Sequence, residues 1–425
     1  MAVVVGLALL VRLGALYGYT EPPRKDAADY DRLGWSLAEG RGYVTASGEP
    51  TAFRPPGLPG LLAAVYVLCG HRVIAAQIVL AVVSAATVAA TALLGATFGG
   101  PVAGLVAGLF AAVYPSFVWS DFGSRTLLAE TLLAALMTWG LVVVIKTRSP
   151  TGAVAAGVLW GLAALTRGTA LVAVAALAVV FCATDDACRR RAALLVVACA
   201  VVVAPWILRD RLVLGSWVPI SSNGGLTLWQ SYNPASRGLG HESEGFAEAR
   251  ALDEEWRARG LGEGQRSRAF AALARREIAG HPARAAGLVA RKLLLFVDPT
   301  LEDALRPGIP VLNYGYAFVL PLALLGVVHA ATGPARRNLL LLAAPALGYG
   351  TAHVVLHTAV RYRLAVEPIL IALAGAGLAF YASRVGLRRA ALLGGGWAVA
   401  VGVAAWRYDA IFTALSRLVR GLGLA

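Results

Sequence analysis

Charged residues are scarce in this sequence. Asp, Glu, Lys and Arg together make up 15% of the 425 residues, whereas 58% are hydrophobic and the mean hydropathy is +0.68. A soluble domain of this length could not bury so much apolar surface, because single cores do not grow that large. The composition therefore excludes an ordinary soluble enzyme and predicts a membrane protein.

Several common functional motifs are also missing. The four cysteines all lie outside the long polar loops and form no C-x-x-C pair, which excludes a disulfide framework or a zinc ribbon. The six histidines are scattered, with no H-E-x-x-H. No P-loop or Rossmann glycine fingerprint occurs, so the sequence offers no site for ATP or a dinucleotide.

Long apolar runs are abundant, and they predict an all-α polytopic membrane protein. The first run ends at Tyr19 and has no basic segment before it, so we interpret it as a retained helix rather than a signal peptide. The run 57–69 is too short to cross the bilayer and is expected to be re-entrant or interfacial. About eleven spans are expected, at 2–19, 72–98, 101–120, 128–146, 152–166, 168–183, 192–207, 311–331, 338–357, 364–383 and 390–406.

The net charge of +14 has its origin in short basic loops. Ten Lys and Arg residues lie in four such loops, which the positive-inside rule places in the cytoplasm, so nucleic acid is not an expected partner. Of the 24 acidic residues, six lie in 20–56 and twelve in 208–306, two loops on the opposite side. Chemistry or binding is therefore expected on the extracytoplasmic face of the cell (plasma or inner) membrane.

The predicted organisation is a single transmembrane domain over 1–425. It contains a first extracytoplasmic loop at 20–70 with interfacial helices, a long extracytoplasmic loop at 208–306 and C-terminal transmembrane helices at 307–425. Two amphipathic stretches, 264–281 and 282–299, are expected to lie on the bilayer or to cap the bundle. A surface helix is expected for the tail 407–422.

The first outer loop combines a carboxylate, an arginine and aromatic residues at membrane level. Asp26 follows the first span, and Tyr30, four residues later, shares its helix face. Pro55 and Pro56 keep Arg54 out of a helix and restrict its direction. An arginine held in this way is well suited to bind a phosphate.

Three further segments supply polar candidates. Glu130 lies at the outer end of the fourth span, where a carboxylate is either functional or structurally paired with Arg125 or Arg167. Arg167 interrupts a long apolar stretch and marks an outer turn. The segment 204–234 has a turn signal at Asn223-Gly224-Gly225 and amide and hydroxyl groups of the kind that bind sugars. Arg361, with Tyr362, lies outside against the positive-inside trend, as expected for binding an anionic head group.

Read in order, these segments resemble a known family. "DAADYDRLGWSLAEGRGYV", "PTAFRPPGLPG", "LLAE", "LTRGTAL", "PWILRDRLVLGSWVPISSNGGLTLW" and "RYRLAVEP" are similar to glycosyltransferase family 39 of the GT-C superfamily, which includes the lipid A aminoarabinose transferase and the protein O-mannosyltransferases. The resemblance implies a GT-C bundle with its active site in the outer loops. It also implies transfer of a sugar from a polyprenyl-phosphate carrier to an acceptor outside the membrane.

The resemblance also implies roles for individual residues. Asp26 matches the catalytic carboxylate, and the positions that match substrate-binding residues are Tyr30, Arg54, Glu130, Arg361 and Tyr362. Arg167 and Asn223 join this set as candidates from the reading of the residues above. Some relatives have a metal-binding acid where this chain has Phe53, so the resemblance leaves a divalent metal open but assigns it no ligands here. The polyprenyl-phosphate sugar donor is expected as a substrate, and no other cofactor is predicted.

The expected reaction is an inverting transfer with Asp26 as general base. The expected partners are membrane lipids, the lipid-linked sugar and a lipid, glycan or protein acceptor. Two alternatives stay open: a transporter or flippase of a lipid-linked sugar, and a ligase that moves whole polymers. A transporter would place its ionisable groups at mid-membrane and show inverted repeats, neither of which the sequence displays.

Overall fold

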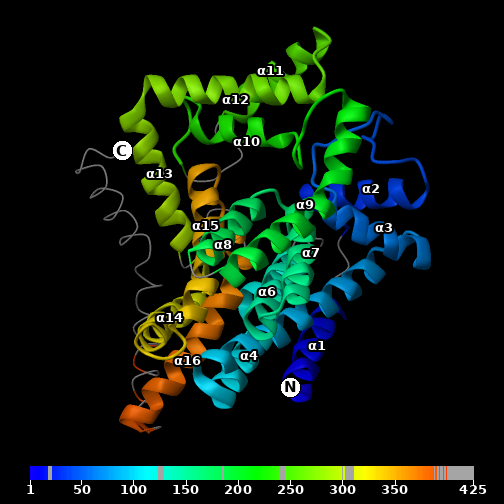
Figure 1. The fold of residues 1–425 in the computed structure, drawn as a ribbon. Coiled ribbons are helices and arrows are strands. Elements are labelled where there is room, and N and C mark those ends of the chain that lie inside the picture. Colours follow the sequence, from blue (N-terminus) through cyan, green and yellow to red (C-terminus); the bar gives the residue numbers. More distant parts are fainter. Residues whose placement is uncertain are drawn as a thin grey trace.

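The protein is an α-helical bundle with a smaller group of helices at one end (Figure 1). The computed structural model describes residues 1–17, 22–122, 129–183, 186–238, 245–298, 300–301 and 311–386, and five single residues between 388 and 399. The helices are α1 (Ala2–Tyr17), α2 (Asp26–Ala38), α3 (Gly57–Cys69), α4 (Val73–Ala112), α5 (Pro115–Phe122), α6 (Ala129–Thr147), α7 (Pro150–Thr166), α8 (Ala170–Cys182), α9 (Asp186–Leu214), α10 (Asn223–Tyr232), α11 (Phe246–Ala258), α12 (Glu263–Gly280), α13 (Pro282–Val297), α14 (Tyr314–Thr332), α15 (Arg336–Val355), the 3₁₀-helix η1 (Val360–Ala365) and α16 (Glu367–Val385).

This architecture confirms the expected all-α polytopic membrane fold. Among the described residues, six helices are long and apolar enough to cross a membrane, namely α4, α6, α9, α14, α15 and α16. Four shorter apolar helices, α1, α3, α7 and α8, accompany them. The expected span at 390–406 and the tail 407–422 lie outside the continuous described ranges.

Helix α4 consists of two halves that turn back on each other at Gly100. That residue has φ +78°, a left-handed conformation that glycine adopts without steric cost, and Pro101 starts the second half. A Cβ added at Gly95 would meet Ala107, so the halves pack closely side by side. The halves correspond to the first two spans expected after residue 70. The span expected over 101–120 is too long, because the helix ends at Ala112 and Pro115 begins α5.

The C-terminal helices pack through small residues. A Cβ at Gly326 in α14 would lie 2.0 Å from the backbone oxygen of Leu373 in α16, and one at Gly377 would lie 2.1 Å from that of Leu322. The two backbones therefore touch, as is common between membrane helices. Before α14, the two-residue strands β1 (Thr300–Leu301) and β2 (Val311–Leu312) pair antiparallel, with Thr300 opposite Leu312.

The described helices between residues 223 and 297 cap one end of the bundle. Helices α10, α11 and α12 lie together there, and α13 leads back toward the bundle (Figure 1). The amphipathic stretches expected at 264–281 and 282–299 are confirmed as α12 and α13. The turn expected at Asn223-Gly224-Gly225 is wrong, because these residues begin α10. A Cβ at Gly225 would lie 1.8 Å from the backbone oxygen of Ser267, so this glycine permits close packing of α10 on α12.

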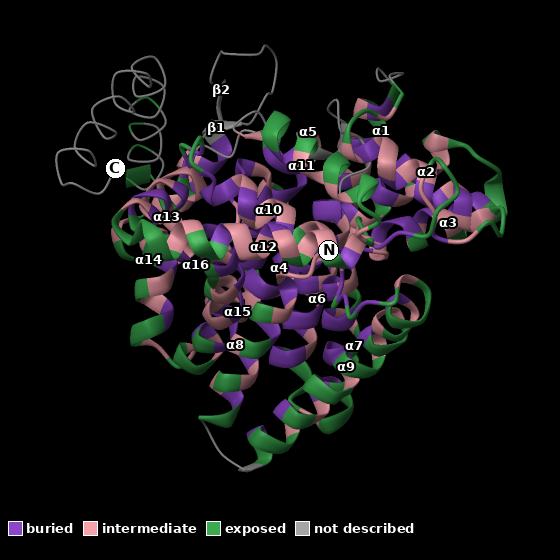
Figure 2. Ribbon diagram, turned by 90° about the horizontal axis from the view of Figure 1, so that it is seen from above, coloured by how far each residue is buried: buried purple, intermediate pink, exposed green. Residues whose placement is uncertain are grey.

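Buried residues lie inside the bundle, and exposed residues lie on its outer faces (Figure 2). The main core draws on most of the long helices and includes the fully buried Trp160. A second, smaller core joins α2 to α3 through Tyr30, Leu33 and Leu62. This small core fixes the helix that carries Asp26 against the bundle.

Candidate active site

Arg54 lies in a loop whose backbone is held from several sides. The hydroxyl of Tyr43 donates to the backbone oxygens of Arg54 (2.9 Å) and Pro55 (3.1 Å). Helix α3 begins only at Gly57, so Arg54 lies outside a helix as the two prolines predict. The side chain is consequently presented from a fixed point of the backbone.

Two long-range contacts tie this loop to the capping helices. Arg209 of α9 donates to the backbone oxygens of Thr51 (2.6 Å) and Tyr43 (3.0 Å). Glu263, at the start of α12, accepts from the Thr51 hydroxyl (2.7 Å), the backbone N–H of Ala52 (2.8 Å) and the Ser222 hydroxyl (2.5 Å). The Glu263 carboxylate thus connects the Arg54 loop, the N-cap residue of α10 (Ser222) and the first turn of α12.

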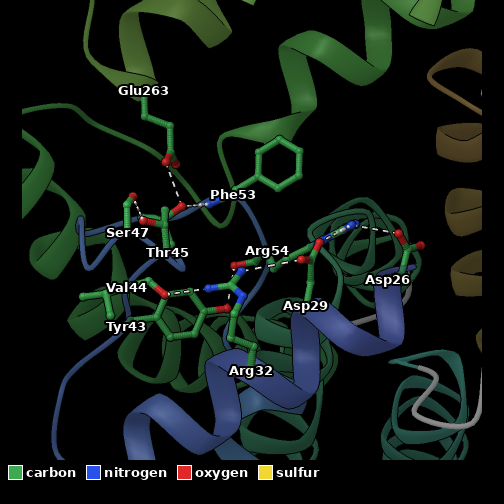
Figure 3. A network of polar contacts seen from close by, with 11 residues as sticks. Asp26, Asp29, Arg32, Tyr43, Val44, Thr45, Ser47, Phe53, Arg54 and Glu263 are labelled. Carbon is green, nitrogen blue, oxygen red and sulfur yellow. Dashed lines mark hydrogen bonds and ion pairs between the residues drawn. The ribbon is translucent and has the colours of Figure 1, made fainter. Parts of the chain in front are cut away.

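The Arg54 guanidinium contacts two carboxylates in the first turn of α2. Its Nη2 lies 2.7 Å from Asp26 Oδ1 and 2.9 Å from Asp29 Oδ2, and its Nε donates to the same Asp29 oxygen at 3.2 Å (Figure 3). The positive end of the α2 helix dipole also stabilises the negative charge of both carboxylates. The arrangement is a charge-assisted fork of the kind arginine favours.

Arg361 of η1 connects this fork to a second ion pair. Its Nη2 lies 3.4 Å from Asp26 Oδ2, and its Nε lies 4.0 Å from Glu130 Oε1. Glu130, with its side chain only 2% exposed, also forms an ion pair with Arg167. The Arg167 guanidinium stands 4.3 Å from the ring centroid of Tyr362. The network of alternating charges therefore joins the Arg54 loop to α2, α6, η1 and the end of α7. We call this network the charge cluster.

The burial and the charges of this network shift the pKa values of its side chains. Burial by itself would raise the pKa of Asp26, but the positive charges of Arg54 and Arg361 outweigh it and hold that pKa below the usual 3.8. Burial by itself would lower the pKa of Arg54, but the carboxylates of Asp26 and Asp29 raise it, so the guanidinium stays charged. Burial raises the pKa of Tyr30 to about 12, so its hydroxyl is neutral.

Seven of the eight residues selected from the sequence contribute to this cluster or border it: Asp26, Tyr30, Arg54, Glu130, Arg167, Arg361 and Tyr362. Asn223 does not join them within the described part of the chain. It starts α10 and accepts a hydrogen bond from Ser221 (2.8 Å). Of the two partners considered for Glu130, the structure shows Arg167, while Arg125 lies outside the described residues.

Sequence reasoning missed four residues of the site. Asp29 was detectable, because it stands three residues after Asp26 and therefore shares its helix face. Tyr43, Arg209 and Glu263 carry no local signal, since each acts on a loop distant in the chain or through a backbone contact.

The carboxylates of this site do not suit a metal ion. Asp26, Asp29 and Glu130 are each engaged by arginines, and Phe53 offers no ligand atom. Among the described residues no group of three His, Cys, Asp or Glu side chains could hold a metal. We therefore assign no step to a metal.

A cavity of about 420 Å³ opens beside the charge cluster. Arg54 and Asp29 line it on one side, together with residues of the loop 45–53. Helices α10, α11 and α12 form the opposite side, where Gln230 and Phe246 face the cavity. The site thus combines buried ion pairs with a space large enough for a small ligand.

Removing one member of the Glu130–Arg167 pair should destabilise the protein. Arg167→Met leaves a carboxylate that is 2% exposed without its closest counter-charge, which we expect to lower the free energy of unfolding by about 3 kcal/mol. The double variant Arg167→Met/Glu130→Gln should recover most of this loss. Thermal unfolding in detergent measures both, and a double variant no more stable than the single one would contradict the pairing.

Comparison with known proteins supports the fold. Residues 53–208 match the family described as dolichyl-phosphate-mannose-protein mannosyltransferase. Among solved structures, ArnT from Cupriavidus metallidurans bound to undecaprenyl phosphate is similar over 100% of this chain and 73% of its own, with 17% identity and a TM-score of 0.58. No curated protein sequence matches the chain.

A second solved structure is more distant. The archaeal oligosaccharyltransferase AglB from Archaeoglobus fulgidus, in complex with an inhibitory peptide and a dolichol-phosphate, matches 95% of this chain with 15% identity and a TM-score of 0.54. The chain spans only 54% of AglB. The chain is therefore a multi-pass membrane protein with the GT-C fold that its sequence resemblance predicted, and its residues 53–208 match the dolichyl-phosphate-mannose-protein mannosyltransferase family.

Proposed function

We propose that the protein is a glycosyltransferase that moves a sugar from a polyprenyl-phosphate carrier to an acceptor on the outer side of the plasma (inner) membrane. The observation that carries this proposal is Arg361, which bridges Asp26 and Glu130 beside Arg54. The undecaprenyl phosphate in ArnT and the dolichol-phosphate in AglB support a lipid phosphate as the donor group.

Arg361 and Arg54 are the groups that would bind the donor phosphate. Arg361 contacts its two carboxylates at 3.4 and 4.0 Å, longer than the 2.7 Å between Arg54 and Asp26. An incoming phosphate can replace these longer contacts at lower cost. Both guanidiniums remain charged at any physiological pH, so they would stabilise the negative charge that grows on the departing phosphate.

Asp26 would act as general base. The acceptor hydroxyl attacks the anomeric carbon, its proton passes to Asp26, and the bond to the phosphate oxygen breaks with its electron pair on the phosphate. Binding of the phosphate to the arginines would weaken their hold on Asp26 and raise its pKa toward a more useful value. A base opposite the leaving group implies inversion at the anomeric carbon.

The positions of these residues favour an enzyme over a transporter. Asp26 begins α2, Glu130 is in the first turn of α6, Arg167 follows α7, and Arg361 lies in η1 between α15 and α16. All occupy the ends of helices, whereas transporters hold their substrates near mid-membrane on broken helices.

Replacing the base tests the mechanism. Asp26→Asn keeps the shape of the side chain but cannot accept the proton, so release of polyprenyl phosphate from a panel of polyprenyl-phosphate sugars should fall about 10²–10⁴-fold. Asp31→Asn is the matched control, because Asp31 lies on the same helix but contacts Tyr66 and His71. Equal rates for Asp26→Asn and the wild type would remove Asp26 from this role.

The lowered pKa of Asp26 predicts how the activity depends on pH. Because its pKa in the free protein lies below 3.8, the carboxylate is already ionised at neutral and mildly acidic pH. We therefore expect kcat/KM for the donor to stay level between about pH 5 and 8 and to fall only as the pH approaches the lowered pKa. A decline centred near pH 6.5 in wild type would point to histidine as the base.

Chemical labelling tests the side of the membrane. With the four natural cysteines replaced by serine, Glu254→Cys on exposed α11 should react with a membrane-impermeant maleimide added to intact cells. Arg189→Cys, in the basic first turn of α9, should react only after the cells are opened. The reverse pattern would place the charge cluster on the cytoplasmic side.

A further inference from the structure

Most of the charged side chains that line the cavity beside the charge cluster neutralise one another. Arg54 is bound to Asp29, Arg266 to Asp253 at 2.8 Å, and Glu263 accepts three hydrogen bonds. Arg257 has no carboxylate partner among the described residues, but it stands exposed to water. A ligand of this cavity therefore needs no strong charge of its own.

Two phenylalanines and one amide give the cavity its binding groups. Phe53 is 36% exposed and Phe246 is 47% exposed, and both residues line the cavity, so their rings are accessible to a ligand there. Phenyl rings stack on the C–H face of a sugar ring. The side-chain amide of Gln230 has no protein partner among the described residues and offers both donor and acceptor groups to hydroxyls.

The cavity lies away from the hydrocarbon region. Its lining comes from α2, the loop 45–54 and α10–α12, and none of the six candidate membrane spans contributes to it. Because no candidate span lines the cavity, we expect a ligand to reach it from the aqueous side.

The cavity adjoins the groups assigned to catalysis. Arg54 and Asp29 line it, and the Arg54 guanidinium lies 2.7 Å from Asp26 on its other side. Asp29 and Asp26 therefore contact the same guanidinium, with Asp29 on the cavity side. The volume of about 420 Å³ falls within the range of small-ligand sites.

We infer that this cavity is the acceptor site and that the acceptor is a water-soluble, neutral carbohydrate. This inference rests on the proposed function. The sugar ring stacks on Phe53 and Phe246, Gln230 binds its hydroxyls, and Asp29 accepts a hydrogen bond from one of those hydroxyls.

Ligand binding without turnover tests this assignment. A panel of neutral disaccharides is titrated against the full chain in nanodiscs and followed by saturation-transfer NMR. We expect at least one disaccharide to bind, and Phe246→Ala and Gln230→Ala each to weaken that binding about tenfold. Trp217→Ala is the matched control, because Trp217 is 65% exposed on the same capping region but does not line the cavity.

Three outcomes would overturn the inference: no disaccharide binds, binding is unchanged in both cavity variants, or hydroxylated peptides bind in place of sugars. Release of polyprenyl phosphate is measured on the same preparations. A protein that turns over its donor but binds no disaccharide loses this acceptor site and keeps the proposed function, whereas one that binds sugars without donor turnover loses the proposed function.

Discussion

The contact between Arg54 and the first turn of α2 is the interaction on which the site depends. Two carboxylates three residues apart face the same guanidinium at 2.7 and 2.9 Å. Partly buried charges of this kind are stable only as a group, since removing one leaves its partner without compensation. The balance of charge keeps Asp26 ionised and Arg54 protonated, and it fixes both at the point where α2 meets the bundle.

The loop that carries Arg54 couples this ion pair to the capping helices. Glu263 and Arg209 hold the loop through its backbone, so the position of Arg54 depends on α9 and α12 as well as on its own prolines. The same contacts place the cavity next to the charge cluster. In the proposed reaction, the donor phosphate and the acceptor bind next to the same guanidinium, that of Arg54.

Local sequence patterns predicted much of this architecture. The apolar runs anticipated most helices of the bundle, and the stretch expected from residue 282 begins α13 at Pro282. The concentration of acids in two loops indicated the end of the bundle where the site lies. Where the rules failed, packing overrode propensity: Asn223-Gly224-Gly225 forms the start of α10 because Gly225 rests against Ser267.

The amino-acid sequence by itself determined the all-α membrane fold and the candidate residues, because hydropathy, proline positions and charge distribution act over short distances along the chain. Only the tertiary structure decided which of these residues pair with one another. Glu130 pairs with Arg167, Arg361 reaches Asp26 across most of the chain, and Glu263 holds the Arg54 loop. Such pairings depend on which helix ends meet in space, and no local pattern records that.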